Sequence, residues 1–161
     1  MTHKKDLIQL SNELTYHRYM ISHKQAEGLF KCLTVPEYIV LQHISHSIIG
    51  KNNDENRVYL KDIAEELGMA IPKASKMVRK LNDKGLVTWE HDGNGSDGTY
   101  VIITQSGMTL MNEQQNILKN YYSRVINDFG EEKLVTLLQM MKDLEIAMDL
   151  ELNVGDDENG E

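Results

Sequence analysis

The chain of 161 residues contains a single cysteine, Cys32, and so cannot form an internal disulfide. Small secreted domains usually depend on several disulfides, whereas this chain must depend on a hydrophobic core. Its 40% of hydrophobic residues can supply one core of ordinary size. A lone cysteine also suits a reducing compartment, so we expect a cytoplasmic protein.

Long hydrophobic runs are missing as well. No segment approaches the roughly 18 uninterrupted apolar residues of a membrane-spanning helix, and the polar start MTHKKDLIQ has no signal-peptide core. We therefore expect a soluble protein with no membrane partner.

The motifs of common enzymes and cofactor sites are also missing. The sequence has no P-loop, dinucleotide fingerprint, nucleophile elbow or paired-carboxylate arrangement. His43 and His46 stand three residues apart on one predicted helix, but no third ligand accompanies them at the spacing of a zinc site. We expect no enzyme activity, no cofactor and no metal.

The net charge of −8 is located at one end of the chain. Eight acidic residues and no lysine or arginine follow Lys142, and the rest of the chain balances 17 basic residues against 17 acidic ones. Because the Debye length is about 8 Å at physiological salt, a remote acidic tail hardly weakens a local cationic patch.

The stretch from Leu60 to Gly85 has the pattern of two short helices joined by a tight turn. Gly68 ends the first helix, and Pro72 stands in the first turn of the second, where its missing N–H costs nothing. Apolar residues recur at i, i+3, i+4 and i+7 in both segments. They are Leu60, Ile63, Ala64 and Leu67 in the first helix, and Ala74, Met77, Val78 and Leu81 in the second.

The opposite face of the second helix is cationic. At 100° per residue, Ser75, Lys76 and Arg79 point away from the predicted core, and Lys73 and Lys80 flank them. Such a face suits the major groove of DNA. The simpler alternative is an amphipathic helix with a solvated charged face.

After Gly85 the apolar period changes from 3.6 to about 2. Residues 86–91 and 99–104 have the composition of strands, and the connection DGNGSDG suits a hairpin loop. Helix, turn, helix and hairpin make a winged helix-turn-helix. We predict a mainly α-helical fold with a small β-hairpin wing.

Further helices are predicted on both sides of this unit. One covers residues 6–26, another begins at Thr34 with a T-x-x-E capping box, and two long helices after Thr104 are separated by Gly130. A domain this small cannot cover the apolar faces of the terminal helices. Mutual burial in a twofold homodimer is therefore favoured over a monomer that folds them back.

These patterns divide the chain into four segments. We expect an N-terminal dimerisation helix at 1–33, a winged helix-turn-helix DNA-binding domain at 34–104, C-terminal dimerisation helices at 105–152 and an acidic disordered tail at 153–161.

The order of elements and several motifs resemble the MarR family of bacterial transcriptional regulators over nearly the whole chain. The motifs are LTVPEYIVLQHI from Leu33, DIAEELG from Asp62, KGLV from Lys84, and ITQSG from Ile103 in place of the family's L-T-x-x-G. The resemblance implies a DNA-binding homodimer on a palindromic operator, usually a repressor, that a small ligand or an oxidant releases.

The helix pattern and the resemblance together give the candidate site residues. Double-stranded DNA is the expected partner of Pro72, Lys73, Ser75, Lys76, Arg79, Lys80 and Lys84 on the second helix and of Asn94 and Ser96 in the wing. A small-molecule effector is expected in the crevice where the first and second helices meet the fifth. Its lining would be Tyr16, Tyr19, Tyr38 and Met111, which are equally suitable as core residues.

Two positions depart from the family pattern. The family's wing normally carries an arginine for the minor groove, but no lysine or arginine occurs from Gly85 to Leu118, and Asp97 falls near the expected position. Ala70 replaces the usual Ser or Thr cap of the second helix, at a cost of about 1 kcal/mol of helix-end stability.

Two alternatives stay open. Peroxide-sensing relatives use a lone cysteine early in the first helix, whereas Cys32 stands beside the start of the second, so we favour an ordinary thiol. The alternative to a regulator is a winged-helix protein-interaction module whose cationic helix meets an acidic partner, which would be indifferent to duplex DNA.

Overall fold

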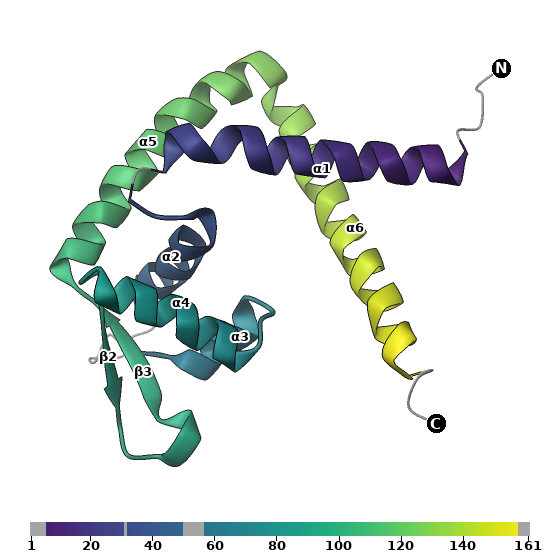
Figure 1. Cartoon of the computed structure of the whole chain (residues 1–161). Helices are drawn as coiled ribbons and strands as arrows, with labels where there is room; N and C mark the ends of the chain where they lie inside the picture. Colours follow the sequence, from purple (N-terminus) through teal and green to yellow (C-terminus); the bar gives the residue numbers. More distant parts are fainter. Residues whose placement is uncertain (1–5, 31, 50–56, 158–161) are drawn as a thin grey trace. The chain divides into compact units, whose positions relative to one another are not determined.

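The computed structural model describes residues 6–30, 32–49 and 57–157 (Figure 1). The chain divides into two compact units, Met1–Ile117 and Leu118–Glu161, and each is described by itself. Across the described ranges, no helix combines the length and the apolar character that a bilayer span needs.

The first unit holds a winged helix-turn-helix preceded by one long helix, which confirms the predicted fold class. Its helices are α1 (Leu7–Leu29), α2 (Val35–Ile49), α3 (Leu60–Glu66), α4 (Ile71–Asp83) and the start of α5 (Gln105–Phe129). Its strands are β1 (Val58–Tyr59), β2 (Val87–His91) and β3 (Thr99–Ile103), with a short 3₁₀ turn at Gly95–Asp97. The sheet is antiparallel in the order β1-β3-β2, and Trp89 lies opposite Val101.

The helix ends follow the capping signals in the sequence. The Glu37 side chain accepts from the Thr34 backbone N–H at 2.8 Å, and the Thr34 hydroxyl accepts from the Glu37 N–H at 3.4 Å, so the predicted capping box of α2 is confirmed. Gly68 and Gly85 follow α3 and α4 with φ of 57° and 71°, where a side chain would be strained. Ala70 is the N-cap of α4 and makes no side-chain hydrogen bond, as predicted.

One hydrophobic core joins α2, α3, α4 and the sheet. Leu41 and Ile44 of α2, Ile63 of α3, Leu81 of α4 and Val101 of β3 are all fully buried. Every such side chain contributes about 1.5–3 kcal/mol when it leaves water, so this cluster holds α4 firmly against the rest of the unit. The outward face of α4 is thereby fixed in direction.

The ITQSG segment joins the wing to α5 through the end of α4. The Thr104 hydroxyl donates to the Gly85 carbonyl at 2.7 Å and accepts from the Gly107 N–H at 3.0 Å, and the Thr104 N–H donates to the Leu86 carbonyl. A Cβ at Gly107 would collide with that carbonyl oxygen. Because Leu86 and Thr104 are used in this junction, β2 and β3 are one residue shorter at their base than predicted.

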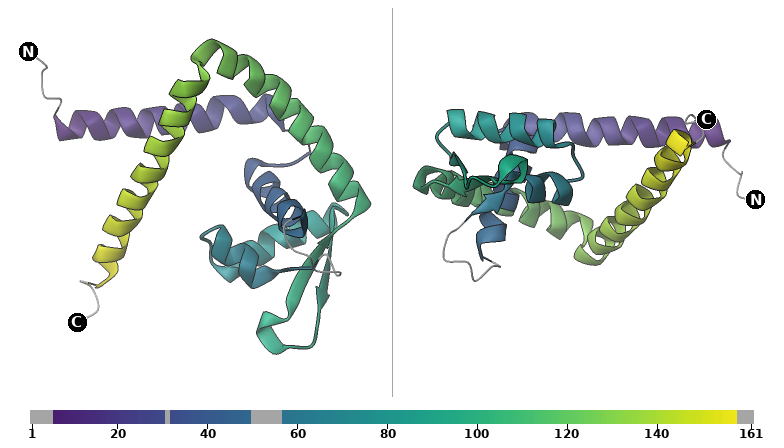
Figure 2. Two further views of the ribbon diagram at one scale, coloured as in Figure 1. Left: turned by 180° about the vertical axis from the view of Figure 1, so that it is seen from behind. Right: turned by 90° about the horizontal axis from the view of Figure 1, so that it is seen from below.

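Helix α1 is anchored near its C-terminal end. The buried side chain of Gln114 in α5 donates to the Leu29 carbonyl at 2.6 Å, and the rings of Phe30 and Tyr38 are in contact. The apolar side chains of its N-terminal half stay exposed, among them Leu7 and Ile8. Figure 2 shows this half of α1 extending beyond the winged-helix part.

The second unit contains the end of α5 and helix α6 (Glu131–Asp157), joined at Gly130. Gly130 has φ of 102°, which confirms the predicted break between the two long helices. Helix α6 continues past its predicted end at Leu152. Several of its large apolar side chains are exposed: Val135, Leu137, Leu138, Met140, Met141, Leu144, Ile146, Met148, Leu150 and Leu152.

Candidate nucleic-acid interface

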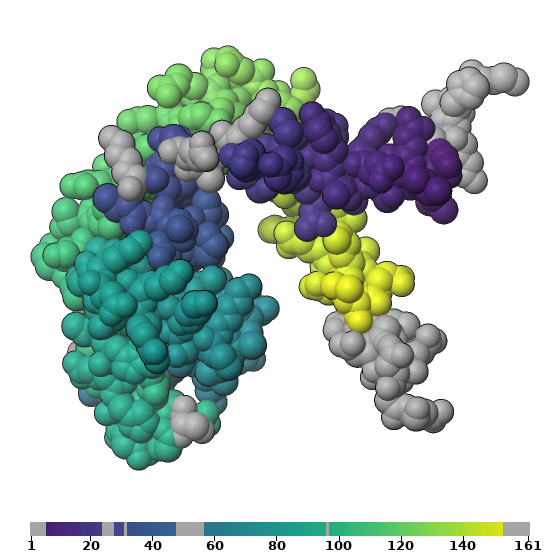
Figure 3. All heavy atoms as spheres, in the orientation of Figure 1, coloured from purple at the N-terminus to yellow at the C-terminus, as the bar shows by residue number. Residues whose placement is uncertain are grey.

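Helix α4 separates a buried apolar face from an exposed cationic one. Ala74, Val78 and Leu81 have no exposed surface, whereas Met77, predicted for the same core, is half-buried at its edge. Lys73, Lys76, Arg79 and Lys80 are all exposed, and Ser75 is half-exposed between them. The predicted reading residues thus share the exposed side of α4. The space-filling view shows this helix, in teal, at the front of the winged-helix part (Figure 3).

The four exposed cations of α4 are available to an external anion. Among the residues that the structure describes, none of the four forms an ion pair or a hydrogen bond through its side chain. Like charges at i, i+3 and i+4 on one helix repel one another, and a polyanion removes that repulsion.

Lys84 has a different environment from the other cations. Its ammonium donates to the Glu37 carboxylate at 2.7 Å and to the Cys32 carbonyl at 3.0 Å, so it ties the end of α4 to the start of α2. The Glu37 side chain is only 6% exposed, while that of Lys84 is 39% exposed. The sequence predicts Lys84 as a DNA contact, but in the structure its ammonium is hydrogen-bonded to other residues of the protein.

The pKa of Glu37 reflects this contact. Burial raises the pKa of the carboxyl group, but the hydrogen bond from Lys84, the Thr34 backbone N–H and the nearby ammonium charge together lower it below its ordinary value. Glu37 is therefore ionised at neutral pH and holds Lys84 in place.

The wing is built from acidic and neutral groups. Asp92 accepts from the Asn94 N–H at 2.9 Å and from the Tyr59 hydroxyl at 3.0 Å. The hydrogen bond from the Asn94 backbone, more than the one from Tyr59, holds the pKa of Asp92 below its ordinary value. The same contact with Asp92 raises the pKa of Tyr59. Asn94 and Asp97 are exposed, whereas the side chain of Ser96 lies outside the described residues. A cation for the minor groove is therefore missing at the wing itself.

One cation from outside the hairpin, Arg57, lies against a strand of the wing. The Arg57 guanidinium lies 4.5 Å from the centre of the Tyr100 ring, and the Tyr100 hydroxyl donates to Glu90 at 2.7 Å. These contacts hold Arg57 beside the hairpin by a cation–π interaction.

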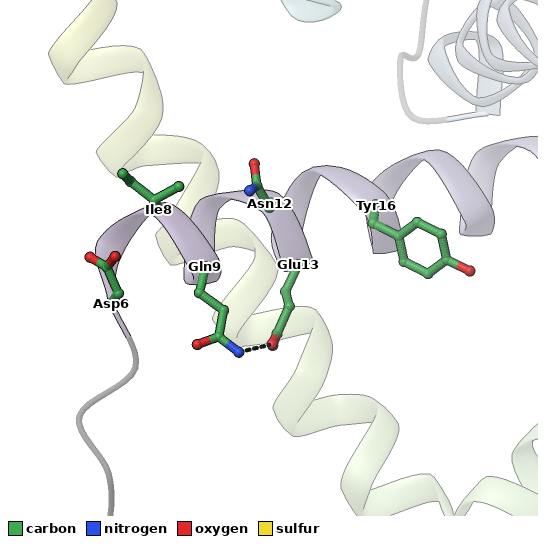
Figure 4. Close-up of a pocket in the computed structure, with 6 residues that line it drawn as sticks. All are labelled: Asp6, Ile8, Gln9, Asn12, Glu13 and Tyr16. Carbon is green, nitrogen blue, oxygen red and sulfur yellow. Dashed lines mark hydrogen bonds between the residues drawn. The ribbon is translucent and has the colours of Figure 1, made fainter.

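The predicted effector residues fall into two groups. Tyr38 and Met111 are buried in the first unit, whereas Tyr16 and Tyr19 are 58% and 56% exposed on α1. Tyr16 borders a hollow along α1 in which Gln9 donates to Glu13 (Figure 4). The lining of this hollow is Asp6, Ile8, Gln9, Asn12, Glu13 and Tyr16. All six come from one helix and its N-cap, and an effector site at the four predicted residues stays a prediction.

His43 and His46 line a crevice between α2 and the end of α3, together with Glu66. The His43 Nε2 lies 3.3 Å from the Ser47 hydroxyl. Over the described ranges, no three His, Cys, Asp or Glu side chains are grouped to hold a metal ion. Cys32 is exposed.

Sequence relatives of the chain are transcriptional regulators. A family model described as the N-terminal DNA binding domain of the iron dependent repressor matches residues 50–94. The HTH-type transcriptional regulator SarT of Staphylococcus aureus is 26% identical over 122 residues, which cover 74% of this chain and 94% of the relative.

Solved structures share the fold. A mutant of MarR from E. coli complexed with operator DNA has a TM-score of 0.68 and 16% identity over 87% of this chain and 99% of its own. The S. aureus MepR–DNA complex has a TM-score of 0.62 and 15% identity over 91% and 99%. PcaV from Streptomyces coelicolor with its natural ligand also scores 0.62, at 15% identity over 91% and 94%. The resemblance to the MarR family is thereby confirmed at the level of the fold.

Proposed function

We propose, from the MarR-type fold of this chain, that the protein is a sequence-specific DNA-binding transcriptional regulator that represses genes as a homodimer on a palindromic operator. The observation that carries the proposal is the outward face of α4, where four exposed cations have no partner in the described part of the chain. Two of the structures that share the fold were solved with DNA, which supports this reading.

Helix α4 would enter the major groove. In helix-turn-helix proteins the second helix places its side chains against base edges, while lysines beside it meet phosphates. Ser75, Lys76 and Arg79 are the residues best placed for bases, and an arginine is suited to the two acceptors of guanine. Lys73 and Lys80 lie farther round the helix and are assigned to the backbone.

The homodimer is supported by exposed apolar side chains in each unit. In the first unit, Leu10 and Leu14 on α1 are 46% and 40% exposed, and in the second, Leu138 and Met141 on α6 are 48% and 46% exposed. Monomeric soluble proteins rarely leave so much contiguous apolar surface in water. A twofold dimer would bury these faces and present two copies of α4 to half-sites about one DNA turn, ~34 Å, apart.

Release by a small molecule completes the proposal. The two copies of α4 could have one spacing that fits the operator and another that does not. An effector that binds the second form of the dimer better would shift the population toward it and release the DNA. PcaV, which shares the fold, was solved with its natural ligand. Tyr16, Tyr19, Tyr38 and Met111 are the residues to substitute first in a search for the site.

Operator titrations test the reading face. A duplex selected by the full chain from a random pool is titrated with wild-type protein and with Arg79→Ala, Lys76→Ala and Asn94→Ala at two salt concentrations. Loss of a base contact should cost about 1–3 kcal/mol per half-site, and loss of Asn94 much less. Lys133→Ala on α6, also an exposed cation, is the matched control and should bind as the wild type does.

The result separates the two functional classes. Binding that weakens steeply with salt and prefers one palindrome supports the regulator. Failure to select any duplex would refute it and favour the protein-interaction module.

The dimer has its own test. Sedimentation of the full chain at micromolar concentration should give twice the monomer mass, and Leu138→Lys should shift it toward the monomer because a charge cannot be buried unpaired in an apolar interface. Deletion of residues 1–26 should give a protein that precipitates or stays unfolded. A soluble, well-folded monomer after that deletion would contradict the dimer.

A further inference from the structure

The start of α4, residues 70–72, is apolar and exposed, unlike the cationic surface that begins at Lys73. Ala70, Ile71 and Pro72 all lie at the surface, and Ile71 is 51% exposed. A helix usually begins with Ser, Thr, Asp or Asn, because their side chains satisfy the free N–H groups there. Here the N-cap is Ala70 and makes no such bond. The side chains exposed at the start of this helix are therefore all apolar, and they offer apolar contact only.

Ile71 belongs to the same row of the helix as two predicted reading residues. At 100° per residue, Ile71, Ser75 and Arg79 succeed one another at i, i+4 and i+8, so they form one ridge along the surface. Pro72, Lys76 and Lys80 form the neighbouring ridge. One ridge thus carries an isoleucine, a hydroxyl and a guanidinium, and the other ends in two ammonium groups.

The major groove offers one apolar group to such a ridge. Thymine presents its C5-methyl there, and no other unmodified base presents a methyl group. Helix-turn-helix proteins direct the N-terminal residues of the second helix toward base edges. The cations of α4 complement the charge of DNA and would bring Ile71, at the apolar start of the helix, to the floor of the groove.

We propose that Ile71 packs on the C5-methyl group of a thymine in each half-site of the operator. This inference rests on the proposed function and adds a specificity-determining residue to it. Ile71 then reads thymine at one end of the ridge, while Arg79 reads a base about two helical turns away. The thymine is recognised by removal of its methyl group from water, with no hydrogen bond from the side chain.

Single-base substitution tests the contact. In the duplex selected by the wild-type protein, each thymine is replaced in turn by deoxyuridine, which lacks only the methyl group, symmetrically in both half-sites. At one position per half-site, wild-type affinity should fall about fourfold for each methyl group lost, as expected for one buried methyl-sized group. Ile71→Ala should bind the original duplex more weakly and be insensitive to deoxyuridine at that same position.

The comparison between proteins removes effects on the DNA itself. Deoxyuridine can change groove shape, but that change acts equally on wild type and Ile71→Ala, so only the difference between them reports the contact. Ile71→Val should keep most of the sensitivity. Ile39→Ala, which shortens an isoleucine 42% exposed on α2, is the matched control and should behave as the wild type does.

The outcomes distinguish this inference from the proposed function. If the wild type selects no duplex, the function itself fails. If it selects a palindrome but deoxyuridine costs wild type and Ile71→Ala equally at every position, the methyl contact is refuted while the regulator stands. A second selection with Ile71→Ser should relax the preference for thymine at one position per half-site and leave the position read by Arg79 unchanged.

Discussion

Replacement of Lys84 by methionine tests the contact between the end of α4 and the start of α2. The substitution keeps most of the length of the side chain but removes the ammonium that lies 2.7 Å from the Glu37 carboxylate and 3.0 Å from the Cys32 carbonyl. Glu37 then stays charged in a site where its side chain is only 6% exposed. The Thr34 backbone N–H still donates to it at 2.8 Å.

The magnitude lies between two limits. Removing one partner of a fully buried ion pair costs about 3–5 kcal/mol, and an exposed pair contributes about 0–1 kcal/mol. Because Lys84 is 39% exposed, water screens the pair and can rehydrate part of the carboxylate. We expect Lys84→Met to lower the free energy of unfolding by about 1–2 kcal/mol.

The effect should depend on pH in a defined direction. The pKa of Glu37 is lower in the folded protein than in the unfolded chain, where it is about 4.3. A group of this kind stabilises the fold at pH values above its unfolded pKa, and the stabilisation is lost as pH falls through the folded pKa. The difference between wild type and Lys84→Met should be full at pH 7 and shrink below about pH 4.

Urea unfolding followed by circular dichroism at pH 7 and at about pH 3 measures the effect, because the carboxyl group of Glu37 becomes protonated only below about pH 4. Lys76→Met is the matched control, because Lys76 is a cation on the same helix and is exposed. Lys76→Met should leave the free energy of unfolding nearly unchanged and weaken DNA binding. Lys84→Met should lower the free energy of unfolding and leave DNA binding nearly unchanged. Equal unfolding free energies for the two variants, or a difference that does not change with pH, would refute the role assigned to Lys84.

Three further substitutions have defined outcomes. Gly107→Ala should destabilise the fold by several kcal/mol in thermal unfolding, because the added Cβ would collide with the backbone. In the control Gly28→Ala the added Cβ meets nothing within 4 Å, so this variant should be neutral or up to about 1 kcal/mol more stable than the wild type. Equal effects of the two substitutions would contradict this reasoning. Ala70→Ser should add about 0.5–2 kcal/mol of stability by capping α4, and no gain would mean that another group already satisfies its N–H donors. Asp97→Arg should tighten operator binding and steepen its salt dependence by about one unit per wing, and an unchanged slope would show that the wing does not approach phosphate.

Local signals in the sequence were sufficient for most of the fold. These signals are the T-x-x-E box at Thr34, the glycines at 68 and 85, and the break at Gly130. Each depends on only a few neighbouring residues, so it could be predicted without knowledge of tertiary contacts. The cationic face of α4 follows in the same way from the helical period.

Periodicity in the sequence was therefore enough to establish the winged helix, the buried face of α4 and the exposure of Lys76 and Arg79, because it relates residues within one element. The contacts of residues that meet across the chain depend instead on tertiary packing. Lys84 is a cation at the end of α4 and was therefore predicted to contact DNA. Its ammonium instead binds the Glu37 carboxylate, which lies 47 positions away in sequence and 2.7 Å away in space. Periodicity carries no information about such distant partners, since they are set by how elements pack.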